Sequence, residues 1–312
     1  MHIRDDSMNP VKDIHLNGSE TADEIVSAMN EGGGFVAKDL AFGVEILKKG
    51  LKETETLKIL SFPADIIATG ARGIIADMAK EKAFDVIIAT CGMLDHDIAR
   101  CFKDYYQGDW NLNDSELYKK GLNRLGNVVV PNESYGEILE KKMTEILATI
   151  EKKEISTHEL CWEIGKHMNE SSILYWCWKN QIPVVIPGIT DGSIGYQLWQ
   201  WMQDHDMKVN VFLDETMLSN LVWEHKRSGA FIIGGGISKH HVIWWAQFKN
   251  GLDWAVYLTT AAFERDGSLS SALPKEAVSW GKIAEDAPTA TIYCDATVAL
   301  PLMWAALKKG II

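Results

Sequence analysis

Short runs of apolar, often β-branched residues recur along the chain, separated by longer stretches in which apolar and polar positions mix. Within each run the apolar residues are consecutive rather than alternating. That pattern is typical of strands buried on both faces of a parallel sheet. We therefore predict strands at residues 56–62, 84–90, 126–131, 182–188, 230–236, 254–260 and 290–296.

Amphipathic stretches of helical length lie between these runs, at residues 22–34, 69–82, 133–153 and 170–181. Strands that alternate with helices predict an α/β fold, a Rossmann-like, doubly wound and mostly parallel sheet with helices on both faces. The polar residues 1–18 carry an Asn-Pro and an Asn-Gly turn signal, and we expect an N-terminal arm there. Residues 19–312 show no repeat and no linker-like break, so we expect them to form one domain.

Several predicted strands end in glycine or in polar residues, and ligands of open α/β sheets bind outside the carboxyl ends of the strands. Residues 234–236 are three glycines, which would let the backbone approach a pyrophosphate or a ribose. Asp191 follows another strand and could hold ribose hydroxyls. Each feature also has a purely structural explanation: a tight strand-to-helix connection for the glycines, and an Asp-Gly turn for Asp191.

The stretch Asp95-His96-Asp97 contains three residue types that bind metals. Adjacent positions cannot all converge on one ion, so we expect no metal site here. Acids near a helix N-terminus, stabilised by the helix dipole, are the alternative explanation.

Lys282 follows Trp280 by two residues in the sequence EAVSWGKI. A lysine has an ordinary pKa of about 10.4, and attack on a carbonyl or imine requires the neutral amine. Desolvation against an aromatic ring would increase the neutral fraction, so Lys282 is a candidate nucleophile. Trp280 offers a π face to a cationic substrate and Glu276 offers a carboxylate to an ammonium group. Alternatively, the lysine stem simply packs along a tryptophan at the surface.

The 312 residues carry a formal net charge of −12 and five cysteines without a CxxC spacing. An acidic chain is a poor general binder of phosphate backbones, so we expect no nucleic-acid partner. Unpaired cysteines favour a cytoplasmic location. We find no signal peptide in the first residues and no apolar run long enough to span a membrane.

The order GGGISKHH, LDWAVYLTTA, DGSLSSALPKEAVSWGKI and YCDATVALPL resembles deoxyhypusine synthase of the archaeal type, as do the earlier blocks FPADIIATGARG, TCGMLDHDIAR, LNRLGNVVVPNESY and PGITDGSIG. The resemblance implies NAD-dependent transfer of the aminobutyl group of spermidine to a lysine of the hypusine-bearing translation initiation factor precursor. It implies an imine on Lys282 as the intermediate. It also implies a homotetramer with active sites at dimer interfaces.

The resemblance also assigns residues to roles. The implied catalytic residues are Lys282 and His240. The implied substrate-binding residues are Trp280, Glu276, Asp95, His96, Gly267 and Ser268. The implied cofactor-binding residues are Asp65, Thr90, Cys91, Gly92, Asp191, Gly234, Gly235, Thr260, Asp266, Ser270 and Asp295. No metal is implied.

The chain departs from the family pattern at a few positions. Eukaryotic members place polyamine-gripping acids where His96, Tyr196 and Leu269 stand here. Asp65 replaces a usual asparagine and Ser271 a usual glycine. Two alternatives therefore stay open: aminobutyl transfer between small polyamines, as in a homospermidine synthase, and a non-catalytic NAD-binding paralogue that regulates an active subunit.

Overall fold

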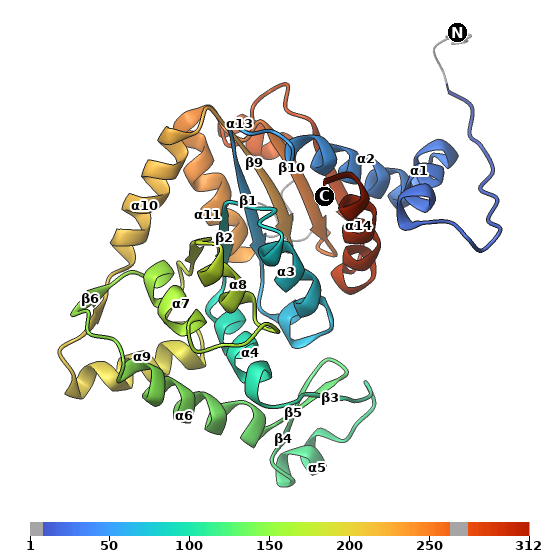
Figure 1. Ribbon diagram of the computed structural model, residues 1–312. Coiled ribbons are helices and arrows are strands. Elements are labelled where there is room, and N and C mark those ends of the chain that lie inside the picture. The colour runs from blue at the N-terminus through green and yellow to red at the C-terminus, as the bar shows by residue number, and fades with distance from the viewer. Residues whose placement is uncertain (1–8, 263–273, 312) are drawn as a thin grey trace.

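The computed structural model of the protein describes residues 9–262 and 274–311 (Figure 1). In this part of the chain the main sheet has six strands, all parallel, in the order β11-β10-β9-β1-β2-β7. Its strands are β1 (Thr56–Phe62), β2 (Val86–Ala89), β7 (Val184–Val185), β9 (Arg227–Ile233), β10 (Trp254–Thr259) and β11 (Thr289–Tyr293). The predicted parallel α/β sheet is confirmed.

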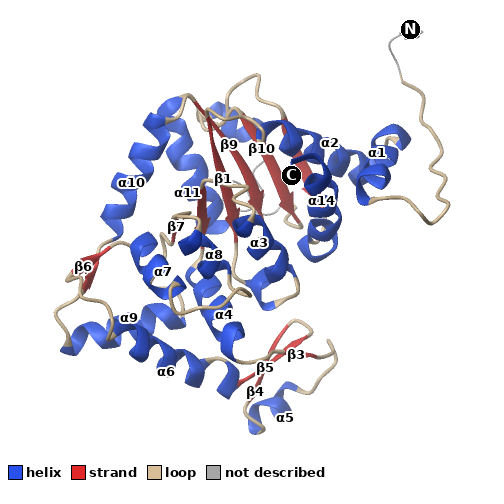
Figure 2. Cartoon of the chain, viewed as in Figure 1, coloured by secondary structure: helices blue, strands red, loops and turns tan. Residues whose placement is uncertain are grey.

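Helices cover both faces of this sheet (Figure 2). Alternate residues of each strand face opposite sides, and each side has its own apolar core: Leu60 belongs to one, and Leu57 and Ile59 belong to the other. The larger core contains residues of α1 (Ala22–Gly32), α2 (Phe35–Gly50), α3 (Ala71–Lys80), α4 (Cys91–Phe102), α6 (Gly136–Leu147), α7 (Thr157–Gly165), α8 (Ile173–Lys179), α9 (Ser193–Asp204) and α14 (Ala296–Ile311). The smaller core contains residues of α10 (Val211–Glu224), α11 (Gly236–Ala246) and α13 (Pro274–Ser279).

One strand prediction was wrong in its placement. The run at 126–131 forms β5 (Val128–Pro131), which is antiparallel to β4 (Leu122–Leu125) and β3 (Tyr106–Gln107) in a separate three-stranded sheet. Three consecutive valines do not reveal whether one or both faces of a strand will be buried. Gly126, with φ of +61°, turns the chain back tightly enough for β4 and β5 to pair as a hairpin.

Three smaller elements complete the described structure. The short helix α5 (Asp114–Lys119) flanks the three-stranded sheet, and β6 (Glu154–Ile155) pairs with β8 (Lys208–Val209). Residues 9–21 precede α1 without helix or strand. Thr21 caps α1 and exchanges hydrogen bonds with Glu24, which fixes where the helix begins.

Candidate functional site

A cleft of about 640 Å³ lies at the carboxyl ends of β1, β9, β10 and β11, where the sequence predicted a ligand site. We call it the strand-end cleft. The tip of the β4–β5 hairpin forms part of its wall, through Leu125 and Gly126. It brings together these predicted cofactor-binding residues: Asp65, Gly234, Gly235, Thr260 and Asp295.

The backbone of the cleft is shaped for close approach. Gly234 and Gly236 have φ of +68° and +72°, a left-handed conformation that favours glycine. Between β1 and α3, a turn of 3₁₀ helix (Asp65–Ala68) lines the cleft. Arg100 of α4 holds this segment, because its Nη1 donates hydrogen bonds to the carbonyl oxygens of Ile67 at 2.7 Å and Thr69 at 2.5 Å. Sequence reasoning missed Arg100, since these contacts span more than thirty residues.

Four other predicted cofactor residues lie at the ends of β2 and β7, outside the lining of the cleft. Cys91 is fully buried at the start of α4, and burial raises the pKa of its thiol to about 12. Gly92 lets that helix start pack closely, because a Cβ there would come within 2.8 Å of Ala64 Cβ. The Thr90 hydroxyl is buried and has no hydrogen-bond partner among the described residues, whereas Asp191 is exposed. A buried hydroxyl without a hydrogen-bond partner, as in Thr90, is compatible with the binding of a polar ligand.

Lys282 and His240 belong to the part of the chain that packs around the smaller core, and they interact electrostatically. Gly281, with φ of +67°, ends α13, and Lys282 N then donates to Ala277 O at 2.9 Å. Burial, and then the positive charge of Lys282, lower the pKa of His240 below its ordinary value. His240 is therefore a neutral imidazole at pH 7 and can accept a proton.

Trp280 and Glu276 complete the predicted substrate group. Lys282 Nζ lies 5.5 Å from the centroid of the Trp280 ring, and this ring is 68% exposed. Glu276 is exposed on α13. None of Lys282, Trp280 and Glu276 lines the strand-end cleft among the described residues. In a single copy, the candidate nucleophile is therefore not part of the wall of that cleft as far as the described residues form it.

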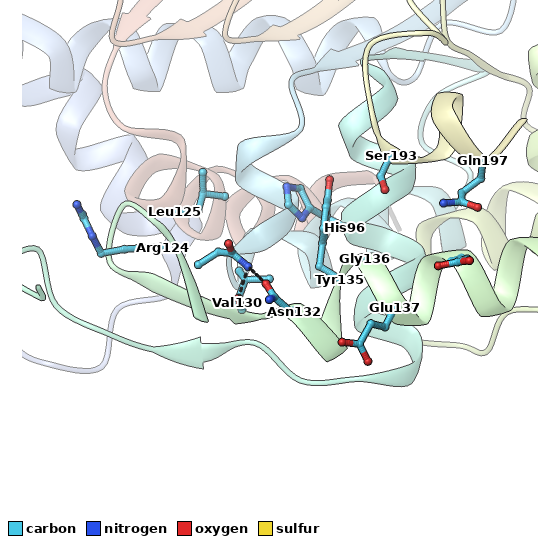
Figure 3. A pocket seen from close by; sticks show the side chains of 12 residues that line it. His96, Arg124, Leu125, Val130, Asn132, Tyr135, Gly136, Glu137, Ser193 and Gln197 are labelled. Carbon is cyan, nitrogen blue, oxygen red and sulfur yellow. Dashed lines mark hydrogen bonds between the residues drawn. The ribbon is translucent and has the colours of Figure 1, made fainter. Parts of the chain in front are cut away.

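A second cavity, of about 600 Å³, lies between α4, α6, α9 and the β4–β5 hairpin (Figure 3). We call it the His96 cavity. Burial, and to a lesser extent the charge of Arg100, lower the pKa of His96 to about 4, and its Nδ1 lies 3.0 Å from the Tyr105 hydroxyl. Glu137 and Glu140, one turn apart on α6, also line the cavity; sequence reasoning did not single them out.

Asp95 does not line either cavity. Its carboxylate is buried and accepts hydrogen bonds from Ser193 N (2.9 Å), Ile194 N (2.8 Å) and the Tyr135 hydroxyl (2.7 Å). Burial raises the pKa of Asp95, and these three hydrogen bonds oppose that rise. In this structure Asp95 binds the first turn of α9.

Asp97 plays the same part for another helix. Its carboxylate accepts hydrogen bonds from the backbone of Ile173 and Leu174, at the start of α8, and from Arg72 Nε at 2.8 Å. Acids at the N-terminus of their own helix were therefore the wrong explanation of Asp95-His96-Asp97. These residues lie beyond the first turn of α4, which contains no acid, and the two acids bind the N-termini of other helices. Across the described residues, no group of three or more potential ligands could hold a metal ion.

The remaining predictions fall on two regions. Tyr196, at a position where eukaryotic members have an acid, is 56% exposed on α9. The other predicted site residues lie outside the part of the chain that the structure describes: Asp266, Gly267, Ser268 and Ser270.

Comparisons with known proteins agree over the full length of the chain. The family model described as deoxyhypusine synthase matches residues 24–307. Two curated relatives, each described as a probable deoxyhypusine synthase, come from Picrophilus torridus and Thermoplasma acidophilum. The first is 53% identical, over 96% of this chain and 97% of the relative; the second is 50% identical, over 95% and 96%.

A crystal structure of an Entamoeba histolytica protein, described as a "putative deoxyhypusine synthase", has the same fold. The TM-score is 0.66, with 19% identity over 95% of this chain and 96% of that one.

Within residues 9–262 and 274–311, no helix combines the length and the apolarity needed to cross a bilayer.

Proposed function

Because the chain belongs to the deoxyhypusine synthase family, and is therefore a transferase, we propose that it transfers the aminobutyl group of spermidine to one lysine of the hypusine-bearing translation initiation factor precursor, with NAD as cofactor. The observation that carries this proposal is the pairing of Lys282 with a neutral His240 beside the exposed ring of Trp280. A cytoplasmic location belongs to the proposal, because its protein substrate is a translation factor. Residues 19–312 would act as one catalytic domain.

The strand-end cleft fits a dinucleotide. Glycine backbone at 234–236 would approach the pyrophosphate, and Asp295 would take ribose hydroxyls through its Oδ2, because its Oδ1 already accepts hydrogen bonds from Thr297. The chemistry that a bound NAD would supply there is hydride acceptance from the polyamine and later hydride donation. Asp65 brings a negative charge to this cleft, so a dinucleotide there would require Asp65 to turn outward.

The catalytic group would work by proton transfer and imine exchange. Neutral His240 would take a proton from the substrate amine or from Lys282, which leaves the lysine able to attack a carbon–nitrogen double bond. This attack would expel 1,3-diaminopropane, the remainder of spermidine, and leave the aminobutyl carbons as an imine on Lys282. Attack by the acceptor lysine would then release Lys282 as a free amine, and return of the hydride would reduce the imine on the acceptor lysine to a secondary amine. Trp280 would hold the alkyl stem and the ammonium group against its ring.

The His96 cavity is our candidate for the far end of the polyamine. A neutral His96 does not repel an ammonium group, whereas Glu137 and Glu140 attract one. These two glutamates would supply the acidic character that eukaryotic members obtain at the positions of His96 and Tyr196.

Two copies would be needed to complete an active site. Lys282 does not line the strand-end cleft of its own chain among the described residues, and large aromatic side chains are exposed on α10, on α11 and in the segments that follow α11 and α13. We propose that the chain forms a homotetramer in which Lys282 of one copy faces the cleft of another. The exposed aromatic residues are Phe212, Trp223, Trp244, Phe248 and Trp280.

The test is incubation of the purified protein with NAD, the factor precursor and spermidine labelled in its butyl carbons. We expect label on the precursor and, after borohydride treatment, on the enzyme. Lys282→Ala should lose both labels while it still binds NAD, and Lys208→Ala, which removes an exposed lysine of β8, should keep both. Absence of labelled precursor with the unchanged protein would rule the function out.

The missing acids at His96 and Tyr196 favour one second candidate, aminobutyl transfer to a free diamine. The same assay with putrescine as the sole acceptor separates the two, because homospermidine would then be the product. Labelling of the precursor by the homo-oligomer alone would exclude a non-catalytic paralogue.

A further inference from the structure

His240 has an aromatic neighbour on its own helix. Trp244, one turn further along α11, places its ring 6.0 Å from the His240 ring at an interplanar angle of 29°. Trp244 is 43% exposed, which is costly for so large an apolar surface unless the ring serves a site or a partner. A stacked indole shields one face of the imidazole from water, which favours the neutral form of His240.

The residues next to this pair are held by one carboxylate. Oε1 of Glu215 of α10 lies 3.1 Å from Nε2 of His241, in a contact that lacks hydrogen-bond geometry, and Oε2 accepts a hydrogen bond from Nε1 of Trp245 at 2.9 Å. The side chain of His241 is only 14% exposed. Because the two contacts lie one turn apart on α11, they fix the rotation of this helix about its own axis.

The two sets of contacts have a joint consequence. Each residue that Glu215 binds follows directly after a member of the His240–Trp244 stack. A helix whose inner side is fixed in this way presents the stack in one direction, toward Lys282. We propose that Glu215 and Trp244 are positioning residues for His240: Glu215 sets the direction of the imidazole and Trp244 sets its orientation and hydration. This inference rests on the proposed function of His240.

Among the described residues, these charged and titratable groups act on the stack or on the adjacent His241. Lys282 acts on His240 from the segment after α13, and His241 lies beside it on α11. Glu215 and Asp214 of α10 face His241. Burial is the main cause of the lowered pKa of His240, so a smaller side chain at position 244 should return this pKa toward its ordinary value.

The first test follows dehydrogenation of spermidine by the appearance of reduced cofactor. We expect Trp244→Leu to lower kcat by about ten-fold to a hundred-fold without changing the Kd for NAD. Its acid limb in the pH profile should move to higher pH, and Trp244→Phe should restore most of the rate. Trp199→Leu, which removes an exposed tryptophan of α9, is the matched control and should behave as the unchanged protein.

The role of Glu215 is tested in the same assay. Glu215→Ala should lower kcat by roughly ten-fold, and Glu215→Gln should recover most of it, because an amide still accepts from Trp245 and can donate to neutral His241. An equal loss in Trp244→Phe and Trp244→Leu, an unmoved acid limb, or a parallel loss of NAD binding would overturn the proposal.

A second measurement needs no activity. Exchange of the C2 hydrogen of His240 with deuterium, followed by mass spectrometry across a pH series, reports the pKa of this imidazole directly. We expect it to rise in Trp244→Leu and to stay low in Trp199→Leu. If the unchanged protein forms no reduced cofactor, the proposed function fails, and this titration still decides whether Trp244 controls His240: an unchanged pKa in Trp244→Leu refutes it.

Discussion

His96 is a histidine whose surroundings lower its pKa and keep its ring neutral in mild acid. It is half-buried, and Tyr105, Tyr135 and the charge of Arg100 surround it. These neighbours oppose a positive charge on the ring. The residue therefore acts as a neutral hydrogen-bonding group, and its depressed pKa has a consequence for the stability of the fold.

We expect the free energy of unfolding to decrease as the pH is lowered through the titration of His96. Its folded-state pKa is about 4 against an ordinary 6.5, so below pH 6.5 the unfolded chain binds a proton that the folded chain refuses. The loss between these pH values should be on the order of 2–3 kcal/mol. His96→Gln should flatten this dependence, as measured by urea unfolding midpoints at neutral and acidic pH. An identical slope in the variant would show that His96 does not cause it.

Residue-level prediction from the sequence worked where the signal was local. Trp280, Gly281 and Lys282 are adjacent in the chain, so their proximity follows from the sequence itself. The fate of Asp95 could not be foreseen, because its partners lie 98 and 99 positions away. A carboxylate that follows a strand end has the same sequence signature whether it binds a ligand or a distant helix.

At the scale of elements, one turn of α4 organises two other helices. Asp95 binds the first backbone N–H groups of α9, and Asp97 binds those of α8. The N-terminus of a helix leaves such groups without partners inside the helix, and a carboxylate there is further favoured by the helix dipole. Arg72 neutralises Asp97, which is fully buried.

Asp97→Asn should destabilise the protein strongly. It removes the charge that compensates Arg72, whose side chain is only 8% exposed, and breaking such a buried pair costs about 3–5 kcal/mol. Asp114→Asn breaks the exposed pair with Arg124 and should leave the stability almost unchanged. Urea unfolding of both variants gives the comparison. Equal and small shifts would mean that the Asp97 network contributes little.

Elements were predictable when burial alone defined them. The strand at 56–62 was confirmed at both ends, since its apolar run is bounded by polar residues and by Pro63. Of the strand predicted at residues 182–188, only Val184–Val185 forms a strand in the structure. The small sheet was misplaced because antiparallel pairing depends on the hairpin turn at Gly126, a three-dimensional choice that apolarity does not encode.

At the scale of the whole molecule, the candidate nucleophile and the strand-end cleft are two separate features of the described structure. Lys282 does not line the cleft and acts electrostatically on His240, and Trp244 and Trp280 expose their rings. Such a division is typical of proteins whose sites are completed by a second copy across a two-fold interface.

Complementation between two inactive variants tests this arrangement. Lys282→Ala lacks the nucleophile, and Gly235→Trp should fill the strand-end cleft. When the two are dissociated together and reassembled, half of the sites in each mixed pair regain an intact cleft and an intact lysine. Random mixing should then restore roughly a quarter of the activity. Activity no higher than that of the separate variants would place each complete site within one chain.

Leu125, at the tip of the β4–β5 hairpin, borders both the strand-end cleft and the His96 cavity. A wall common to two compartments makes their volumes interdependent, so any displacement of the hairpin alters both. The free energy of ligand binding in the strand-end cleft then depends on whether the His96 cavity is occupied. Linkage makes this dependence equal in both directions. Binding of a dinucleotide would thus change the affinity for a polyamine, and the reverse, through Leu125 and before any covalent step.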